Sequence, residues 1–310
     1  MAENSIIKLG ASASLIVSLL GSSRGFAENS PKRTTGGDSK TSMRIASFAP
    51  SCTDLVESVH GQDSLVGVCR YCELPAASKI ERIGDFNSAN LERLTRLKPD
   101  MVLAVAGQEA LIGSLKKSGF AVTVFTNSSF NDISKNLVAI GKLTNREKTA
   151  QLQAQAFEHS IDELKSICVG AKPSVFFCVW PQPLLTAGKG SFLNEAVTVC
   201  GGTNIGGQLD APYPHYSMER LVMANPDIIV MPYEAKSNQF LHRQPWTELK
   251  AAKHGRIYFL PKASSDHLTR PSTQVIDGLS WLGKCLHPEK EQELSAWLAK
   301  SRAGIAQAAN

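Results

Sequence analysis

The stretch ERLTRLKPD at residues 92–100 returns later in the chain as ERLVMANPD at residues 219–227. Each copy leads directly into a short apolar run, MVLA at 101–104 and IIVM at 228–231. In both copies apolar residues spaced for one helical face precede a proline, which ends a helix, and then a run that fits a buried strand. The chain therefore predicts one helix–turn–strand unit built twice, as expected of two related α/β lobes.

The composition is that of an ordinary globular chain. Its 310 residues are 43% hydrophobic and 20% charged, with a formal net charge of +5. This is enough material for two domain cores. No block of basic residues stands out, which argues against a nucleic-acid partner.

The N-terminus has the features of an export signal. Lys8 precedes a mildly apolar stretch at residues 9–20, and small residues lead up to Ala27. We predict a signal peptide at residues 1–27, cleaved near Ala27, and a periplasmic protein. The apolar stretch is too short to span a bilayer. Because no cysteine lies near the cleavage site, a lipid anchor there is not expected. Residues 28–42 are polar and predict a disordered tether.

The rest of the chain divides into two lobes and a link. Short strands alternate with helices in residues 43–143, which predicts an N-terminal α/β lobe with a mainly parallel sheet. A capping-box pattern begins at Thr144 and opens a linking helix, residues 144–170. Its apolar face continues to Cys168 without glycine or proline, so a rod of about 36 Å is expected to resist bending. Residues 171–310 predict a C-terminal α/β lobe closed by helices.

The seven cysteines are an odd number, so at least one is expected to lack a partner within the chain. Cys69 and Cys72 form a C-x-x-C motif. There is no second such motif to complete a zinc site, and no thioredoxin-like pattern surrounds this one. We interpret them as small loop residues, and their role stays open.

Four segments carry a resemblance to a known family: LVGVCRY at 65–71, GDFNSANLE at 84–92, PLLTAG at 183–188 and CGGTNI at 200–205. Together they resemble the periplasmic binding proteins of cobalamin, siderophore and haem importers, in particular the cobalamin binders. The resemblance covers roughly residues 43–290. It implies two Rossmann-like α/β lobes joined by a single long rigid helix, and a role as the substrate-binding protein of an ABC importer.

The resemblance also implies where the ligand lies. A corrin ring is broad, flat and ringed by amides, so it favours aromatic faces and a few hydrogen-bonding groups between the lobes. Any one of the aromatic candidates could instead be a core residue. His267 could approach the cobalt as an axial ligand or lie exposed on a polar rim. The candidate ligand residues are Tyr71, Phe86, Trp180, Leu185, Tyr213, Asp266, His267 and Arg270.

Two further sets of residues follow from the resemblance. Matching glutamates on the two lobes of such proteins engage arginines of the membrane permease, and Glu92 and Glu219 occupy those positions. The alternative is that an acid in the first helical turn complements the helix dipole. Cys200 and Cys285 match a disulfide of the family.

Several alternatives stay open. Val105 stands where the cobalamin-binding relatives have a tryptophan, so a smaller corrinoid such as cobinamide fits as well. Haem would need a His or Tyr ligand, and a siderophore usually needs arginines. The scattered histidines do not predict a metal site, and no G-x-S-x-G, P-loop or H-E-x-x-H motif predicts an enzyme. We expect a monomeric binding protein without a cofactor.

Overall fold

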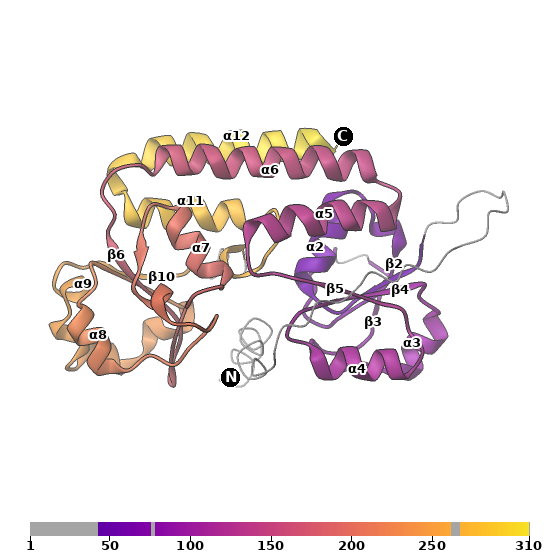
Figure 1. Ribbon diagram of the computed structural model, residues 1–310, viewed down its shortest axis with the longest axis horizontal. Helices are drawn as coiled ribbons and strands as arrows, with labels where there is room; N and C mark the ends of the chain where they lie inside the picture. The colour runs from indigo at the N-terminus through magenta and orange to yellow at the C-terminus, as the bar shows by residue number, and fades with distance from the viewer. Residues whose placement is uncertain (1–42, 76–77, 262–266, 310) are drawn as a thin grey trace.

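The structure, a computed structural model, describes residues 43–75, 78–261 and 267–309. It contains two α/β lobes side by side, with long helices crossing both of them (Figure 1). The predicted fold class is confirmed. The predicted signal peptide, the predicted tether and Asp266 lie outside the described residues.

The N-terminal lobe is built on a sheet of five parallel strands in the order β3-β2-β1-β4-β5. The strands are β1 (Ile45–Ser47), β2 (Leu65–Val68), β3 (Glu81–Arg82), β4 (Met101–Val105) and β5 (Val122–Phe125). The helices are α2 (Pro50–Ser58), α3 (Leu91–Leu97), α4 (Glu109–Lys117) and α5 (Phe130–Thr144), with a short 3-10 helix η2 (Gln62–Ser64). The central strand β1 is buried at every residue, as expected of a parallel strand covered on both faces.

The C-terminal lobe is a mixed sheet in the order β10-β9-β6-β7, with β8 paired to β6. Only the β6–β7 pairing among these is antiparallel. The strands are β6 (Ser174–Pro181), β7 (Leu184–Thr186), β8 (Thr203–Asn204), β9 (Ile228–Met231) and β10 (Ile257–Phe259). The α-helices are α7 (Phe192–Val199), α8 (Met218–Ala224), α9 (Lys250–Lys253), α11 (Val275–Leu286) and α12 (Glu291–Ala309). The 3-10 helices are η3 (Ile205–Gln208), η4 (Tyr233–Ser237), η5 (Gln239–His242), η6 (Trp246–Glu248) and η7 (Pro288–Lys290).

The link between the lobes is α6 (Glu147–Ile167), a helix of 21 residues and about 32 Å. It does not start with the expected capping box. Thr144 is the last residue of α5, Asn145 turns the chain with a left-handed φ of 56°, and Arg146 precedes α6 without a side-chain cap. A capping box is instead present at the start of α5, where Ser129 and Asp132 form it.

A second long helix, α12, runs antiparallel to α6 across both lobes (Figure 1). Trp297 Nε1 donates to the Ser160 carbonyl at 2.9 Å, and Gln153 Nε2 donates to the Ile305 carbonyl at 3.4 Å. Gln153 Nε2 also lies 2.7 Å from the carbonyl oxygen of Ser58 in the N-terminal lobe. Helices α6 and α12 therefore form a packed pair, here called the strut. Such a pair is stiffer than the single helix that the sequence predicted. Among the described residues, no helix has the length and apolar character needed to cross a membrane.

The lobes also touch directly beneath the strut. The rings of Phe130 on α5 and Phe192 on α7 meet edge to face, with 4.9 Å between centroids. The Glu195 carboxylate of α7 accepts from the Phe130 backbone N–H at 2.7 Å. Burial raises the pKa of Glu195. These contacts fix one lobe against the other near α6.

The repeated unit has the same local geometry in both lobes. Asn90 caps α3 by accepting from the Arg93 N–H, and Ser217 caps α8 in the corresponding way. Both helices end in a residue with left-handed φ. The aspartate that follows the proline then accepts from the N–H at the start of the first strand of its lobe, at 2.9 Å for Asp100 and 2.8 Å for Asp227. The sequence repeat is therefore a structural repeat.

Candidate functional site

Most predicted ligand residues lie at the carboxyl ends of the strands. Tyr71 follows β2, Phe86 follows β3, and Trp180 is the last residue but one of β6. In open α/β sheets this is the edge at which ligands bind, because loops there converge beside the ends of the helices. The fold thus places loops of both lobes where a ligand site is expected.

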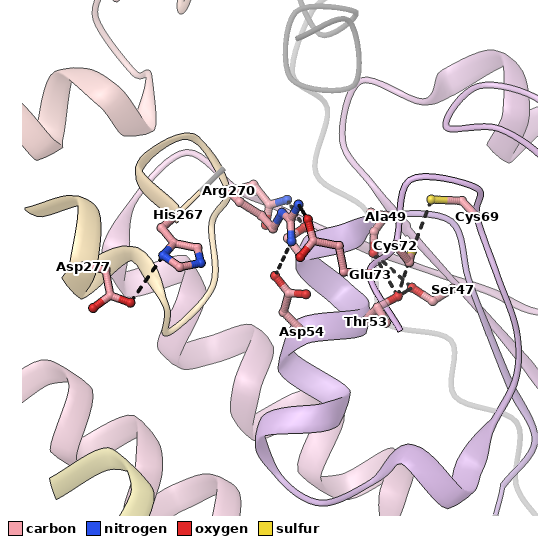
Figure 2. Close-up of polar contacts among 12 residues, drawn as sticks. Ser47, Ala49, Thr53, Asp54, Cys69, Cys72, Glu73, His267, Arg270 and Asp277 are labelled. Carbon is pink, nitrogen blue, oxygen red and sulfur yellow. Dashed lines mark hydrogen bonds and ion pairs between the residues drawn. The ribbon is translucent and has the colours of Figure 1, made fainter. Parts of the chain in front are cut away.

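Arg270 joins the two lobes at this edge. Its guanidinium Nη1 lies 3.2 Å from Oδ2 of Asp54 on α2, and its Nη2 lies 3.6 Å from Oε1 of Glu73 (Figure 2). The Arg270 side chain is 14% exposed and that of Asp54 only 5%. Arg270 was predicted to contact the ligand, and in the structure it forms a buried ion pair with the opposite lobe.

Burial raises the pKa of the Asp54 carboxyl, and the Arg270 guanidinium opposes that rise. A buried carboxylate without its cation is strongly destabilising. Arg270 therefore compensates a charge that Asp54 could not hold alone. Any ligand that enters beside this pair meets a fixed cation and a partly neutralised acid.

His267 lies near Arg270 in sequence but makes a different contact. Its Nδ1 lies 3.3 Å from Oδ2 of Asp277 on α11, within the same lobe (Figure 2). Asp277 is also paired with Arg302, at 2.6 Å. The contact with Asp277 occupies Nδ1 and fixes the orientation of the imidazole, so Nε2 is the ring nitrogen that could act as a ligand.

Tyr71 is the aromatic candidate of the N-terminal lobe, and it is partly exposed. The Arg70 guanidinium carbon lies 6.0 Å from the centroid of its ring. Arg70 is itself held by Asp85, with 2.8 Å between Nε and Oδ1. The ring therefore sits beside a positioned cation on the loop after β2.

Trp180 and Tyr213 are the aromatic candidates of the C-terminal lobe, and both are partly buried. Trp180 Nε1 donates to the Gln182 carbonyl at 2.7 Å, which fixes the indole on its own loop. Burial raises the pKa of Tyr213 to about 12. Tyr213 belongs to a small pocket lined by Phe177, Cys178, Val179, Leu193, Tyr213, Pro232, Leu260 and Thr269.

Two predicted ligand residues are packed into the core. Phe86 and Leu185 are each only 6% exposed. Gln108 Nε2 donates to the Phe86 carbonyl and to the Phe48 carbonyl, which ties this loop to the core. In this structure both residues support the loops and do not offer a face to a ligand.

Glu92 and Glu219 are exposed in the first turns of α3 and α8. Neither forms an ion pair with another described residue. The pKa of Glu219 is lowered by hydrogen bonds from the backbone N–H of Glu219 itself and from Ser217. Both carboxylates are therefore available to an external cation, while the sequence position also suits the helix dipole.

The predicted disulfide between Cys200 and Cys285 is absent from the structure, in which both residues are buried free thiols. The Cys200 thiol instead donates to the Leu279 carbonyl at 3.5 Å. Burial raises the pKa of Cys200, and raises that of Cys285 to about 12.

The sequence reasoning missed Asp54 and Glu73, the acids that receive Arg270. Asp54 lies in a helix in which all residues from Pro50 to Val56 are buried, and this burial depends on packing that the sequence alone does not show. In the part of the chain that the structure describes, no group of three or more His, Cys, Asp or Glu residues could hold a metal ion.

The sequence profile of the family described as periplasmic binding protein matches residues 45–264. The chain belongs to this family. The vitamin B12-binding protein of Vibrio cholerae serotype O1 is 26% identical over 240 residues, which cover 76% of this chain and 86% of that protein. An uncharacterized ABC transporter substrate-binding lipoprotein, YvrC of Bacillus subtilis, is 30% identical over 265 residues, covering 82% of this chain and 83% of that one.

Solved structures show the same fold. The vitamin B12-binding protein BtuF of Vibrio cholerae superposes with a TM-score of 0.70 and 25% identity, covering 80% of this chain and 98% of that one. The haem-binding protein HutB of Vibrio cholerae also gives 0.70, at 18% identity, with coverage of 80% and 100%. This family member is thus a substrate-binding protein of an ABC importer. It acts outside the cytoplasm with a membrane permease and a small ligand, and its relatives are solute-binding proteins, not enzymes.

Proposed function

We propose that this protein captures cobalamin or a related corrinoid between its two lobes and delivers it to the permease of an ABC importer. One observation carries the proposal: partly exposed aromatic side chains stand at the carboxyl ends of strands in both lobes, Tyr71 in one and Trp180 and Tyr213 in the other. Flat aromatic faces on two sides suit a broad, flat macrocycle. The similarity to a vitamin B12-binding protein over three quarters of the chain supports the same ligand class.

The polar groups at this edge also suit a corrinoid. Arg70 is held by Asp85, so it keeps its orientation while it presents its remaining donors. The corrin periphery carries amide carbonyls, which accept hydrogen bonds from such donors. Positioned donors favour a defined orientation of the ring because little side-chain entropy is lost on binding.

Delivery to the permease is assigned to Glu92 and Glu219. One exposed carboxylate on each lobe gives the docked complex a two-point contact with basic residues of the permease. Exposed charges of this kind govern the rate and orientation of docking more than its affinity.

Haem is the second candidate, since a tyrosine can ligate its iron and a haem-binding protein shares this fold. Ligation by tyrosine uses the phenolate. Burial raises the pKa of Tyr213 to about 12, which makes its phenolate costly. This pKa favours a corrinoid over haem ligated at Tyr213.

A titration separates the candidates. The purified protein is mixed in turn with cyanocobalamin, cobinamide, haem and a ferric siderophore, desalted, and its visible spectrum is recorded. We expect a corrinoid to be retained at one molecule per chain, and haem and siderophore to be removed. Retention of haem or the siderophore without either corrinoid would contradict the proposal.

A further inference from the structure

Cys69 and Cys72, the C-x-x-C motif that the binding function does not use, have their thiols in contact. Their Sγ atoms are 3.3 Å apart, and the Thr53 hydroxyl donates to the Cys72 sulfur at 3.1 Å (Figure 2). This differs from Cys200, whose thiol points to a backbone carbonyl. The two sulfurs therefore already face each other.

The backbone holds this pair in a geometry that suits a disulfide. The Cys72 N–H donates to the Cys69 carbonyl at 3.2 Å, which closes a four-residue turn. Such a turn keeps its end Cα atoms within about 7 Å, and disulfides span about 4.4–6.8 Å between Cα atoms. Arg82 Nη1 fixes the turn by donating to the carbonyls of Cys69 at 2.9 Å and Cys72 at 2.6 Å. Bond formation thus requires the sulfurs to approach to about 2.05 Å without rearrangement of the backbone.

The two thiols are also unequal in acidity. The hydrogen bond from Cys72 is the largest cause that lowers the pKa of Cys69, and backbone N–H groups add to it. Burial raises the pKa of Cys72. Cys69 is therefore the better thiolate, and Cys72 is the neighbour that can resolve a mixed disulfide.

We propose that Cys69 and Cys72 form a disulfide in the exported protein, made by exchange with a disulfide-carrying donor. The Cys69 thiolate attacks the donor disulfide, forming a mixed disulfide and releasing one donor thiolate. The Cys72 thiolate then attacks the Cys69 sulfur and releases the second donor thiolate. Two electrons pass from the cysteine pair to the donor, and the two cysteine protons end on the donor thiols. Such bonds persist outside the cytoplasm, where members of this family act.

Burial sets the time at which the bond forms. Cys69 is fully buried and Cys72 is 3% exposed. A donor reaches them when the turn has formed but is not yet packed against Thr53 and Arg82, at a stage when the hydrogen bonds within the turn already lower the pKa of Cys69. Afterwards the bond is shielded from hydrophilic reductants. The bond closes the turn on both sides of Tyr71, so it fixes the loop that carries this aromatic candidate.

The sequence makes the bond directly observable. Trypsin cleaves after Arg70, between the two cysteines, and yields peptides 45–70 and 71–79. The exported protein is purified without reductant, unfolded in N-ethylmaleimide, digested and analysed by mass spectrometry. We expect the two peptides to be recovered linked, and to separate on reduction. Recovery of both peptides unlinked, with maleimide on Cys69 and Cys72, would overturn the proposal.

Cys52 provides a matched control, because it lies in the same peptide as Cys69 and is also buried. Cys52→Ser should keep the linked pair, and Cys69→Ser should lose it. The opposite result would assign the bond to Cys52 and overturn the proposal. Fragmentation of the wild-type linked pair gives the same assignment without a variant, since the maleimide should lie on Cys52.

Discussion

The two copies of the helix–turn–strand unit share their buried residues but differ on their surfaces. Leu94 and Leu221 are both fully buried, and both aspartates after the proline bind the start of a strand. On the exposed side, Arg96 of α3 pairs with Glu81, whereas its counterpart Met223 on α8 is 85% exposed. The fold constrains the buried residues of the repeated unit and leaves the exposed residues free to change.

The glutamates do not follow this division. Glu92 and Glu219 are exposed, so the fold does not require them for packing, yet both copies carry one at the same place in the helix. A helix dipole alone accepts an acid at any of several first-turn positions. Their match therefore favours a shared external partner, as in the proposed docking to the permease.

The largest effect is expected when the charge of both matched glutamates is reversed. Glu92→Arg combined with Glu219→Arg should abolish ligand uptake in a transport assay, because like charges would then face the basic docking residues. Ligand affinity measured by calorimetry should not change. Glu109→Arg with Glu147→Arg is the control, since these are also exposed first-turn acids. Normal uptake by the first variant would refute the docking role.

The inter-lobe ion pair should be worth more than a pair on the surface of one lobe. Arg270→Met leaves the Asp54 carboxylate buried without its cation, which should cost about 3–5 kcal/mol in unfolding free energy. Arg96→Met breaks an exposed pair and should cost about 1 kcal/mol or less. Thermal unfolding compares the two variants, and equal losses would show that the Arg270 pair is not buried in solution.

The contribution of Asp54 to the free energy of unfolding should depend on pH. Because burial raises its pKa above the unfolded value, the folded state binds this proton more tightly than the unfolded chain does. Its contribution therefore favours the fold at acidic pH and is lost as the pH rises through the folded pKa. Arg270→Met removes the cation that opposes the rise, so its destabilisation should shrink as the medium is acidified. A loss that is constant with pH would contradict this assignment.

The shared buried leucines test whether the two units are equivalent. Leu94→Ala and Leu221→Ala should each destabilise the protein by about 2–5 kcal/mol, since each leaves a cavity in a packed core. Urea unfolding should show similar losses for both. Loss in only one lobe would break the structural equivalence of the copies.

The smallest effect concerns Asp227, the aspartate that follows the proline in the second copy. Hydrogen bonds from Lys250 and Ser174 lower the pKa of Asp227 to about 2. Its ionised form therefore contributes stability above the unfolded pKa, and this is lost as the pH falls from about 4 towards 2. Asp227→Asn should lower stability at neutral pH by about 1–2 kcal/mol. The variant should also flatten the acid limb of the stability curve, and an unchanged limb would contradict the assignment.

The parts of the fold that the sequence predicted are those set by neighbours along the chain. Helical periodicity, proline and short apolar runs identified both lobes, the repeat and most of α6, because each is a local signal. Contacts between distant segments could not be read this way. Asp54 and Arg270 are 216 positions apart, and Trp297 and Ser160, which join α12 to α6, are 137 positions apart.

The candidate site was predicted less completely for the same reason. Tyr71 and Tyr213 lie on loops and Trp180 lies near the end of β6, and loop signals and the family resemblance could indicate these positions. Phe86 lies on a loop of the same kind and Leu185 lies in strand β7, but both side chains are buried in the core. The direction of a loop side chain depends on the tertiary packing around it, and sequence spacing does not contain that information.

Whether the ligand touches both lobes is tested most directly by one paired binding measurement. Cyanocobalamin is titrated into the wild-type protein and into Tyr71→Ala and Tyr213→Ala, and the dissociation constants are measured by calorimetry. We predict one molecule bound per chain, and an affinity about tenfold or more weaker in each variant, because each lobe loses an aromatic contact worth about 1.4 kcal/mol or more. Wild-type affinity in both variants, or no binding by the wild-type protein, would contradict the account.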